Sequence, residues 1–206
     1  THSLILNTHP LHLNKLRSHK GIIEEKGALI RYASQNTTIH IPLDDEGSNT
    51  WQLQAKNRIV KTFGNTKRAH THATHVQNHP DATRSFTCIR SEYNPINLHL
   101  SLPGAHHIHN TLAVISVASA LNISPELIKK GVETAPRTKG RLSLCRGLNN
   151  ATILDDTYNS SPKACKIAID LLCEYNDNLR IMVMGDMNDL GSHSTEAHIK
   201  IGRYAK

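Results

Sequence analysis

Acidic side chains follow two apolar segments in the last third of the chain. Asp155 and Asp156 come directly after Thr152-Ile153-Leu154, and Asp186 comes shortly after the apolar run at residues 181–184. Carboxylates at strand ends can bind ribose hydroxyls or organise the coordination shell of a magnesium ion. They can equally do no more than shape a turn. The residues alone leave both interpretations open.

Polar residues also gather where a turn leads into an apolar segment with helical periodicity. Pro103-Gly104 predicts the turn, and His106, His107 and Asn110 fall within the first turns of the helix that follows. Such side chains can cap free backbone N–H groups, or they can contact an anionic ligand lying on the helix start. Spacing alone favours capping.

Two groups of basic residues are further candidates. Arg141, beside Gly140, is either an ordinary surface charge or a planar fork held against phosphate oxygens. His70 and His72 alternate, so on a strand both rings would share one face, as a metal site requires. No cysteine or acidic residue stands beside these two histidines, which favours a solvent-exposed surface.

The elements that must position these residues change in character along the chain. Residues 29–102 contain short alternating runs between turn-rich segments, and this pattern predicts half-buried antiparallel strands at 38–41, 58–63, 85–89 and 96–100. A buried helix follows Pro103-Gly104. Ser124-Pro125-Glu126 then predicts the start of a second helix that ends near Thr134.

The pattern of apolar and polar residues changes again near Gly140. From there it predicts a strand at residues 151–154, a helix that begins at Ser161-Pro162, a strand at 180–184 and a helix from Ser194. Alternating strands and helices with short loops predict parallel strands in a doubly wound sheet, whose ligands bind beyond the carboxyl ends of the strands. The predicted class is therefore α/β, with one domain over residues 1–140 and another over 141–206.

Composition excludes several classes of protein. The 206 residues carry a formal net charge of +7, but the basic residues are scattered and only two Phe and one Trp are available for base stacking, which argues against nucleic-acid binding. No apolar run is long enough to span a membrane, and no signal peptide is recognisable. The four cysteines lie far apart, so reduced thiols are expected.

Five segments, taken in order, resemble the Mur ligase family. They are Thr8-His9-Pro10-Leu11-His12-Leu13 with the later Lys26-Gly27, Leu102-Pro103-Gly104 with His106 and Asn110, Gly140-Arg141-Leu142, Asp155-Asp156-Thr157-Tyr158-Asn159, and Gly185-Asp186-Met187 with Leu190-Gly191. The last two are most similar to the member of the family that adds D-alanyl-D-alanine. The resemblance covers nearly the whole chain and is weakest over residues 31–94.

The resemblance implies part of a central ATPase domain followed by the first half of a Rossmann-like carboxy-terminal domain. It implies an ATP-dependent acid–D-amino-acid ligase of peptidoglycan precursor synthesis, working in the bacterial cytoplasm as a monomer. The substrates would be UDP-N-acetylmuramoyl-tripeptide and D-alanyl-D-alanine, with ATP and Mg²⁺ as cofactors. Neither a nucleic acid nor a membrane is an expected partner.

Individual roles carry over onto the matching positions. His12 and Lys26 match the metal-binding residues of the family, Lys26 after taking up carbon dioxide as a carbamate. Arg141 matches an arginine that reaches the γ-phosphate, so Lys26 and Arg141 are the implied catalytic residues. The nucleotide-binding residues implied by the resemblance are Asn110 and His106 at the adenine, Asp156 near the ribose, Arg141, and Tyr158 with Asn159 along the same cleft.

Three departures from the family pattern matter. His107 stands where an asparagine is usual, Ala28 stands where an acid is common, and no G-x-x-x-x-G-K-[ST] phosphate loop occurs in the chain. The phosphate loop and the amino-terminal domain are expected upstream of Thr1, and the chain alone is expected to be inactive. The alternatives are a non-catalytic remnant used as a binding module, or another Mur ligase.

Overall fold

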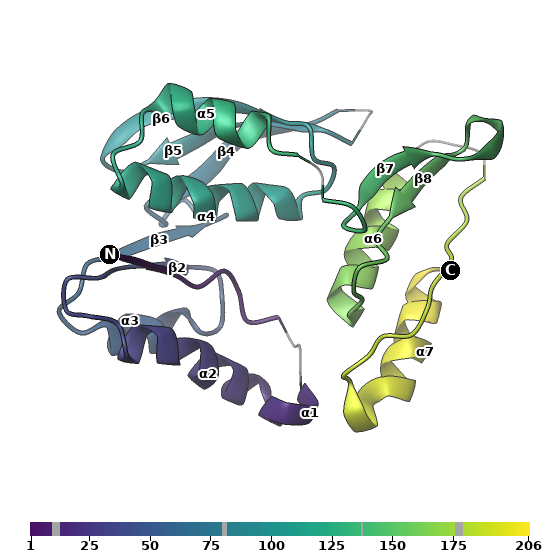
Figure 1. The fold of residues 1–206 in the computed structure, drawn as a ribbon, viewed down its shortest axis with the longest axis horizontal. Helices are drawn as coiled ribbons and strands as arrows, with labels where there is room; N and C mark the ends of the chain where they lie inside the picture. The colour runs from purple at the N-terminus through teal and green to yellow at the C-terminus, as the bar shows by residue number, and fades with distance from the viewer. Residues whose placement is uncertain (10–12, 80–81, 137, 176–178) are drawn as a thin grey trace.

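The computed structural model describes residues 1–9, 13–79, 82–136, 138–175 and 179–206 (Figure 1). In chain order its elements are β1 (His2–Leu4), α1 (Leu13–Leu16), α2 (His19–Arg31), β2 (Thr38–Pro42), α3 (Ser48–Ala55), β3 (Val60–Gly64), β4 (Thr71–Asn78), β5 (Arg84–Arg90), β6 (Tyr93–Leu100), α4 (His106–Ala120), α5 (Pro125–Glu133), β7 (Ser143–Arg146), β8 (Thr152–Asp155), α6 (Pro162–Glu174) and α7 (Ser194–Tyr204). The predicted α/β class is confirmed.

The first part of the chain is built on a mixed six-stranded sheet. Its strands follow the order β1-β2-β3-β4-β5-β6, with β1 to β4 parallel and β4 to β6 antiparallel. The prediction of antiparallel strands was right for 85–89 and 96–100 and wrong for 38–41 and 58–63. Alternation of apolar and polar residues predicts a strand, but it does not tell whether that strand runs parallel or antiparallel to its neighbour. The deciding element is α3, which had not been predicted and which supplies the crossover that parallel neighbours need.

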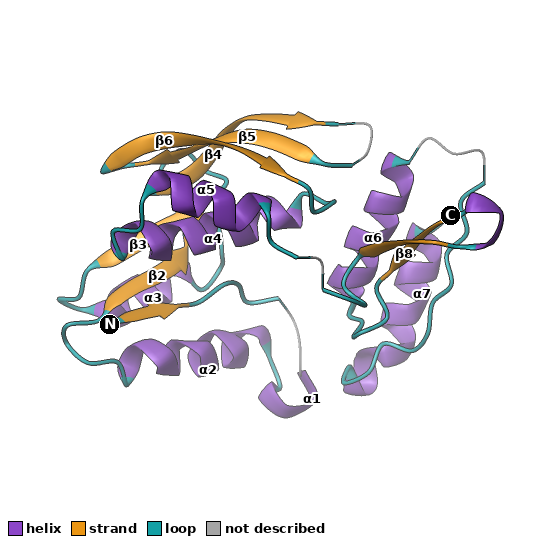
Figure 2. Ribbon diagram, turned by 45° about the horizontal axis from the view of Figure 1, so that its top comes forward, coloured by secondary structure: helices purple, strands orange, loops and turns teal. Residues whose placement is uncertain are grey.

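Helices cover both faces of this sheet (Figure 2). On one face α4 and α5 bury Leu112, Ile115 and Ile128 against strands β3, β5 and β6. On the other face α2 and α3 bury Ile30 and Trp51 against β1 and β2. A layer of helices on each side lets parallel strands exclude water from both faces.

Strand β2 shows how alternation divides its side chains between the two layers. Ile39 and Ile41 pack with Trp51, whereas His40 is buried towards α4, where its Nδ1 lies 2.8 Å from the Ser116 hydroxyl. Because burial disfavours the charged ring, the pKa of His40 falls to about 4.

The helix starts predicted at Ser124 and Ser161 are confirmed, and α2 begins in the same way at Ser18. Ser18, Ser124 and Ser161 are the N-caps of α2, α5 and α6, and each side chain accepts a backbone N–H from the first turn. An N-cap hydrogen bond joins a short polar side chain to a backbone N–H only a few positions away, so the neighbouring residues are sufficient to predict the cap.

The second part departs from the predicted parallel sheet. Strand β8 pairs antiparallel with β7, through a turn in which Asn149 and Asn150 both adopt positive φ. The strand predicted at 180–184 is wrong, because these residues pair with no described strand and Val183 is 93% exposed. Helices α6 and α7 enclose a small core that contains Cys165, Ile169 and Ile201.

Among the described residues, an ion pair and a small apolar cluster join the two parts. Arg84 of β5 donates from Nη2 to both carboxylate oxygens of Glu174 in α6, at 2.6 and 2.8 Å. Beside this pair Ala82 packs with Leu142 and Leu171. The sheets of the two parts are separate. Division into domains at residues 140 and 141 stays a prediction.

The cysteines and helices agree with two expectations from composition. All four cysteines are free thiols. Among the described helices, none combines the length and apolar character that a bilayer crossing demands.

Candidate functional site

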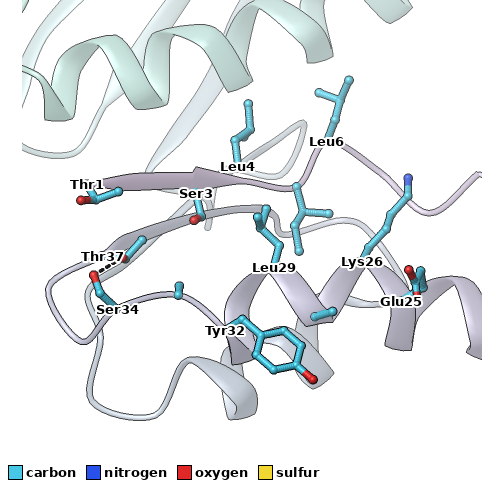
Figure 3. A pocket seen from close by; sticks show the side chains of 13 residues that line it. Thr1, Ser3, Leu4, Leu6, Glu25, Lys26, Leu29, Tyr32, Ser34 and Thr37 are labelled. Atoms are coloured by element: carbon cyan, nitrogen blue, oxygen red, sulfur yellow. Dashed lines mark hydrogen bonds between the residues drawn. The ribbon is translucent and has the colours of Figure 1, made fainter.

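The chain that leaves β1 meets the last turns of α2 at Lys26. The Lys26 ammonium donates a short hydrogen bond to the carbonyl oxygen of Asn7. Figure 3 shows the side chain rising from α2 towards the segment that follows Leu6. Lys26 also lines a groove of about 710 Å³ between β1 and α2, whose other walls include Leu4, Leu29 and Tyr32. The predicted metal-binding lysine therefore lies at the carboxyl end of a parallel strand.

Asp45 holds the segment that contacts Lys26. Its Oδ2 accepts the Thr8 backbone N–H at 2.7 Å, and its Oδ1 accepts the Thr8 hydroxyl at 2.7 Å and the Gly47 N–H at 2.8 Å. His19 reinforces the contact, since its Nε2 lies 2.8 Å from the Thr8 carbonyl oxygen. Thr8 is 3% exposed, so these bonds fix a buried backbone.

Electrostatics joins this region to the second part of the chain. Desolvation, followed by the charge of Lys163 at the start of α6, lowers the pKa of His9, and Asp45 opposes that change. Burial lowers the pKa of the Lys26 amine, again against Asp45. In addition, His109 of α4 places its Nε2 3.0 Å from the Leu6 carbonyl oxygen. Residues from β1, α2, α4 and α6 thus face one region.

The start of α4 has no side-chain cap. Ala105 is the N-cap residue, and its methyl group cannot accept a hydrogen bond. The interpretation of His106 and His107 as N-cap residues is therefore wrong. Gly104 has φ +106°, and a Cβ at this position would meet the His106 ring at 2.7 Å. The uncapped N–H groups remain available to a ligand.

His106 and His107 are neutral rings packed together at this helix start. Their ring centroids lie 4.1 Å apart, and burial lowers the pKa of each to about 4. The positive charge of Arg84 adds to both shifts. His106 Nδ1 is buried without a hydrogen-bond partner among the described residues. A buried polar atom of this kind fits a site that a ligand completes. Asn110 lies one helical turn further on and is partly exposed.

The predicted phosphate and ribose residues meet where the two parts join. The Arg141 guanidinium lies over the Tyr158 ring, 4.3 Å from its centroid. The Asp156 carboxylate accepts the Leu142 N–H at 3.2 Å. Burial raises the pKa of Asp156, while the Leu142 hydrogen bond and the charge of Arg141 work against that shift. Asn159 is exposed and accepts the Ser160 N–H at 2.9 Å.

The histidine-rich segment is only partly a solvated surface. His72, in β4, is 9% exposed and its Nδ1 lies 2.9 Å from the Ala69 carbonyl oxygen, while His70, just before β4, is half-buried with its Nδ1 2.7 Å from the Thr62 hydroxyl. The prediction of solvent exposure is wrong for His72, and it is confirmed for His75, which is exposed. Over the described residues there is no group of three or more possible metal-ligating side chains. His12, the other predicted metal ligand, lies outside those residues.

The structure thus forms three groups of the predicted residues: Lys26 beside the segment after β1, His106 and Asn110 at the start of α4, and Arg141 with Asp156 and Tyr158 at the junction. Sequence reasoning missed Asp45. Asp45 also follows a buried strand, so the rule applied to Asp156 could have found it had β2 been recognised as parallel.

Comparison with known proteins places the chain in a family. Residues 1–118 match the model of the Mur ligase middle domain. The chain therefore belongs to the Mur ligase family, and the resemblance drawn from its motifs is confirmed.

Individual relatives show which members of the Mur ligase family the chain is similar to. The chain is 32% identical to a UDP-N-acetylmuramoyl-tripeptide–D-alanyl-D-alanine ligase from Haemophilus influenzae, over 98% of this chain and 43% of that enzyme. The Escherichia coli ligase of the same name is 28% identical over 99% of this chain and 45% of its own length. A crystal structure of MurF from Acinetobacter baumannii superposes with a TM-score of 0.89, at 28% identity, covering 98% of this chain and 43% of that one. The chain spans less than half the length of these relatives.

Proposed function

We propose that this chain is the part of a D-alanyl-D-alanine-adding ligase that surrounds ATP and the metal ion. The ligase would join D-alanyl-D-alanine to UDP-N-acetylmuramoyl-tripeptide. The observation that carries the proposal is the position of Lys26, whose amine donates to the Asn7 carbonyl beyond the end of parallel strand β1, where His109 of α4 also reaches the Leu6 carbonyl. The names of the Haemophilus and Escherichia relatives supply the substrates.

Lys26 is the proposed metal-side residue. Its lowered pKa increases the fraction of neutral amine, and a neutral amine can attack carbon dioxide. The new N–C bond forms as one C–O π bond opens, and the nitrogen passes its proton to water. The product is an anionic carbamate, an oxygen ligand that suits a magnesium ion. His12 is the proposed second ligand, and a bound Mg²⁺ would neutralise phosphate charge.

The nucleotide would lie across the start of α4. Asn110 and His106 are proposed to face the adenine, and His106 Nδ1 supports this as a buried nitrogen that has no hydrogen-bond partner in the part of the chain that the structure describes. Asp156 is proposed to bind the ribose, with Tyr158 and Asn159 beside it. Arg141 would move from the Tyr158 ring to the γ-phosphate, where its planar fork could hold two oxygens.

The reaction requires the protein to position the substrates and to stabilise negative charge, and it requires no covalent nucleophile. A carboxylate oxygen of the tripeptide attacks the γ-phosphorus, and the bond to ADP breaks to leave an acyl phosphate. The amine of D-alanyl-D-alanine then attacks the acyl carbon, and the tetrahedral intermediate expels phosphate. Arg141 would stabilise the transferring phosphoryl group.

The test is ligation by the full-length ligase that contains this chain. Lys26→Ala should lower the turnover rate by at least about 100-fold, because removing one preorganised electrostatic group costs about 2.7–4 kcal/mol. A short carboxylic acid added to this variant should restore part of the rate. Lys20→Ala, an exposed position on the same helix, is the matched control and should retain full activity. Normal turnover in Lys26→Ala would remove the carbamate from the proposal, and a parent protein without ATP-dependent ligation would overturn the function.

A further inference from the structure

The Asp45 carboxylate accepts three hydrogen bonds, and both of its oxygens take part. Both of its oxygens are occupied, Oδ2 by one N–H and Oδ1 by a hydroxyl and a second N–H. All three partners donate, so an acceptor is required at both oxygens. An asparagine at this position would turn its NH₂ group towards a donor and lose at least one of these bonds.

The bonds of Asp45 lead to Lys26 in two steps. Two of the three bonds come from Thr8, and the residue before Thr8 is Asn7, whose carbonyl oxygen accepts the Lys26 ammonium. Thr8 is almost fully buried, so its backbone cannot shift without breaking the bonds to Asp45. A displaced Thr8 would carry the Asn7 carbonyl away from Lys26.

We infer that Asp45 is a positioning residue, which fixes Asn7 and Thr8 so that the Asn7 carbonyl holds the Lys26 amine at the end of β1. The inference rests on the proposed function for its consequence in catalysis, since Lys26 is the proposed carbamate. Three of the acceptor positions of the Asp45 carboxylate are engaged by Thr8 and Gly47, so the role assigned to it is to hold the backbone.

The reactivity of the Lys26 amine measures this role without any need for ligation. The 206-residue chain is acetylated with trace acetic anhydride, and mass spectrometry gives the rate at each lysine relative to exposed Lys20. In Asp45→Asn the rate at Lys26 should rise at least about fivefold, because the bond that holds its amine is weakened. Lys61, which is paired with Glu92 in the turn between β5 and β6, reports general loosening and should keep its rate.

Three variants complete the design. Glu46→Gln removes the same charge from the neighbouring residue, whose side chain is 80% exposed and pairs with His19 at 3.0 Å, and should raise the rate at Lys26 less than Asp45→Asn does. Thr8→Val deletes only the hydroxyl bond and should give an intermediate rise, while Thr8→Ser keeps the hydroxyl and should behave as the parent chain.

Two results would overturn the inference. One is an unchanged rate at Lys26 in Asp45→Asn, and the other is an equal rise at Lys61, which would mean general loosening. The proposed function fails by a different result, namely the absence of ATP-dependent ligation by the full-length parent protein. The two failures are therefore distinguishable, because acetylation reports the position of the amine whether or not that amine becomes a carbamate.

Discussion

The buried histidine of β2 has a measurable effect on stability. His40 is fully buried, bonded to Ser116 and to His2, with a pKa of about 4 against an ordinary 6.5. The unfolded chain therefore binds a proton first as the pH falls. The contribution of neutral His40 is complete above about pH 6.5 and is lost progressively towards pH 4, with a total of about 3 kcal/mol.

His40→Gln should reduce the amount by which the free energy of unfolding falls between pH 6.5 and pH 4. Urea unfolding followed by the fluorescence of buried Trp51 at pH 7.5, 5.5 and 4.5 measures the free energy of unfolding. His106 and His107 also have lowered pKa values, so the parent chain should lose more than His40 alone explains. In His75→Gln, where the parent ring is exposed, the pH dependence should match that of the parent. An identical slope in His40→Gln and the parent would contradict the assignment.

At the scale of elements, the helices differ in how closely other chain segments approach them. A Cβ at Gly21, in the first turn of α2, would lie 2.2 Å from the carbonyl oxygen of Leu16. A Cβ at Gly131, in α5, would meet no heavy atom within 4 Å. The same substitution should therefore have opposite signs at these two positions.

Gly131→Ala should stabilise the chain by about 0.5–1 kcal/mol, because alanine loses less backbone entropy on entering a helix. Gly21→Ala should destabilise it by about 1–3 kcal/mol, since backbone atoms must shift to make room. Thermal unfolding followed by circular dichroism compares the two variants directly. Destabilisation by Gly131→Ala, or a neutral Gly21→Ala, would show that the helices pack differently.

At the scale of the whole molecule, a partly buried ion pair joins the two parts of the chain. The Arg84 side chain is 4% exposed and that of Glu174 is 36% exposed. Glu174→Gln leaves a buried guanidinium with a weaker partner, which should cost about 2–3 kcal/mol, a figure reduced for the partial exposure of Glu174. The junction near Lys139 and Arg141 should then be cleaved faster by trypsin.

Glu196→Gln is the matched control, because Glu196 forms an exposed pair with Lys200 one turn away in α7. Solvent screens exposed pairs of this kind, so the cleavage rate of this variant should match that of the parent. Equal cleavage of both variants would mean that Arg84 and Glu174 do not restrain the junction.

The chain as a whole should bind ATP weakly. Asn110 and Arg141 are present, but the chain has no phosphate-binding loop sequence, and that loop supplies much of the binding free energy for phosphates. Calorimetry should give a dissociation constant in the millimolar range or no binding, about 4 kcal/mol or less. Micromolar affinity would mean that the described residues hold the phosphates without such a loop.

Local features of this protein could be predicted from its residues. The caps Ser18, Ser124 and Ser161, and the turn at Gly104, depend on groups within about four positions of one another, so the sequence displays both partners. The ordered motifs also identified the family, because each motif is a short run of neighbouring residues. The roles of the site residues remain predictions.

Tertiary structure decided the features whose partners are far apart in the chain. Strand direction in β2 and β3 followed from a crossover helix, and the run at 180–184 formed no strand because a strand needs a neighbour to pair with. The bonds between Asp45 and Thr8 span 37 positions, and those between Arg84 and Glu174 span 90. The alternation and spacing of apolar residues predict which face of a strand or helix a side chain occupies. Which two faces contact each other is decided only when the chain folds.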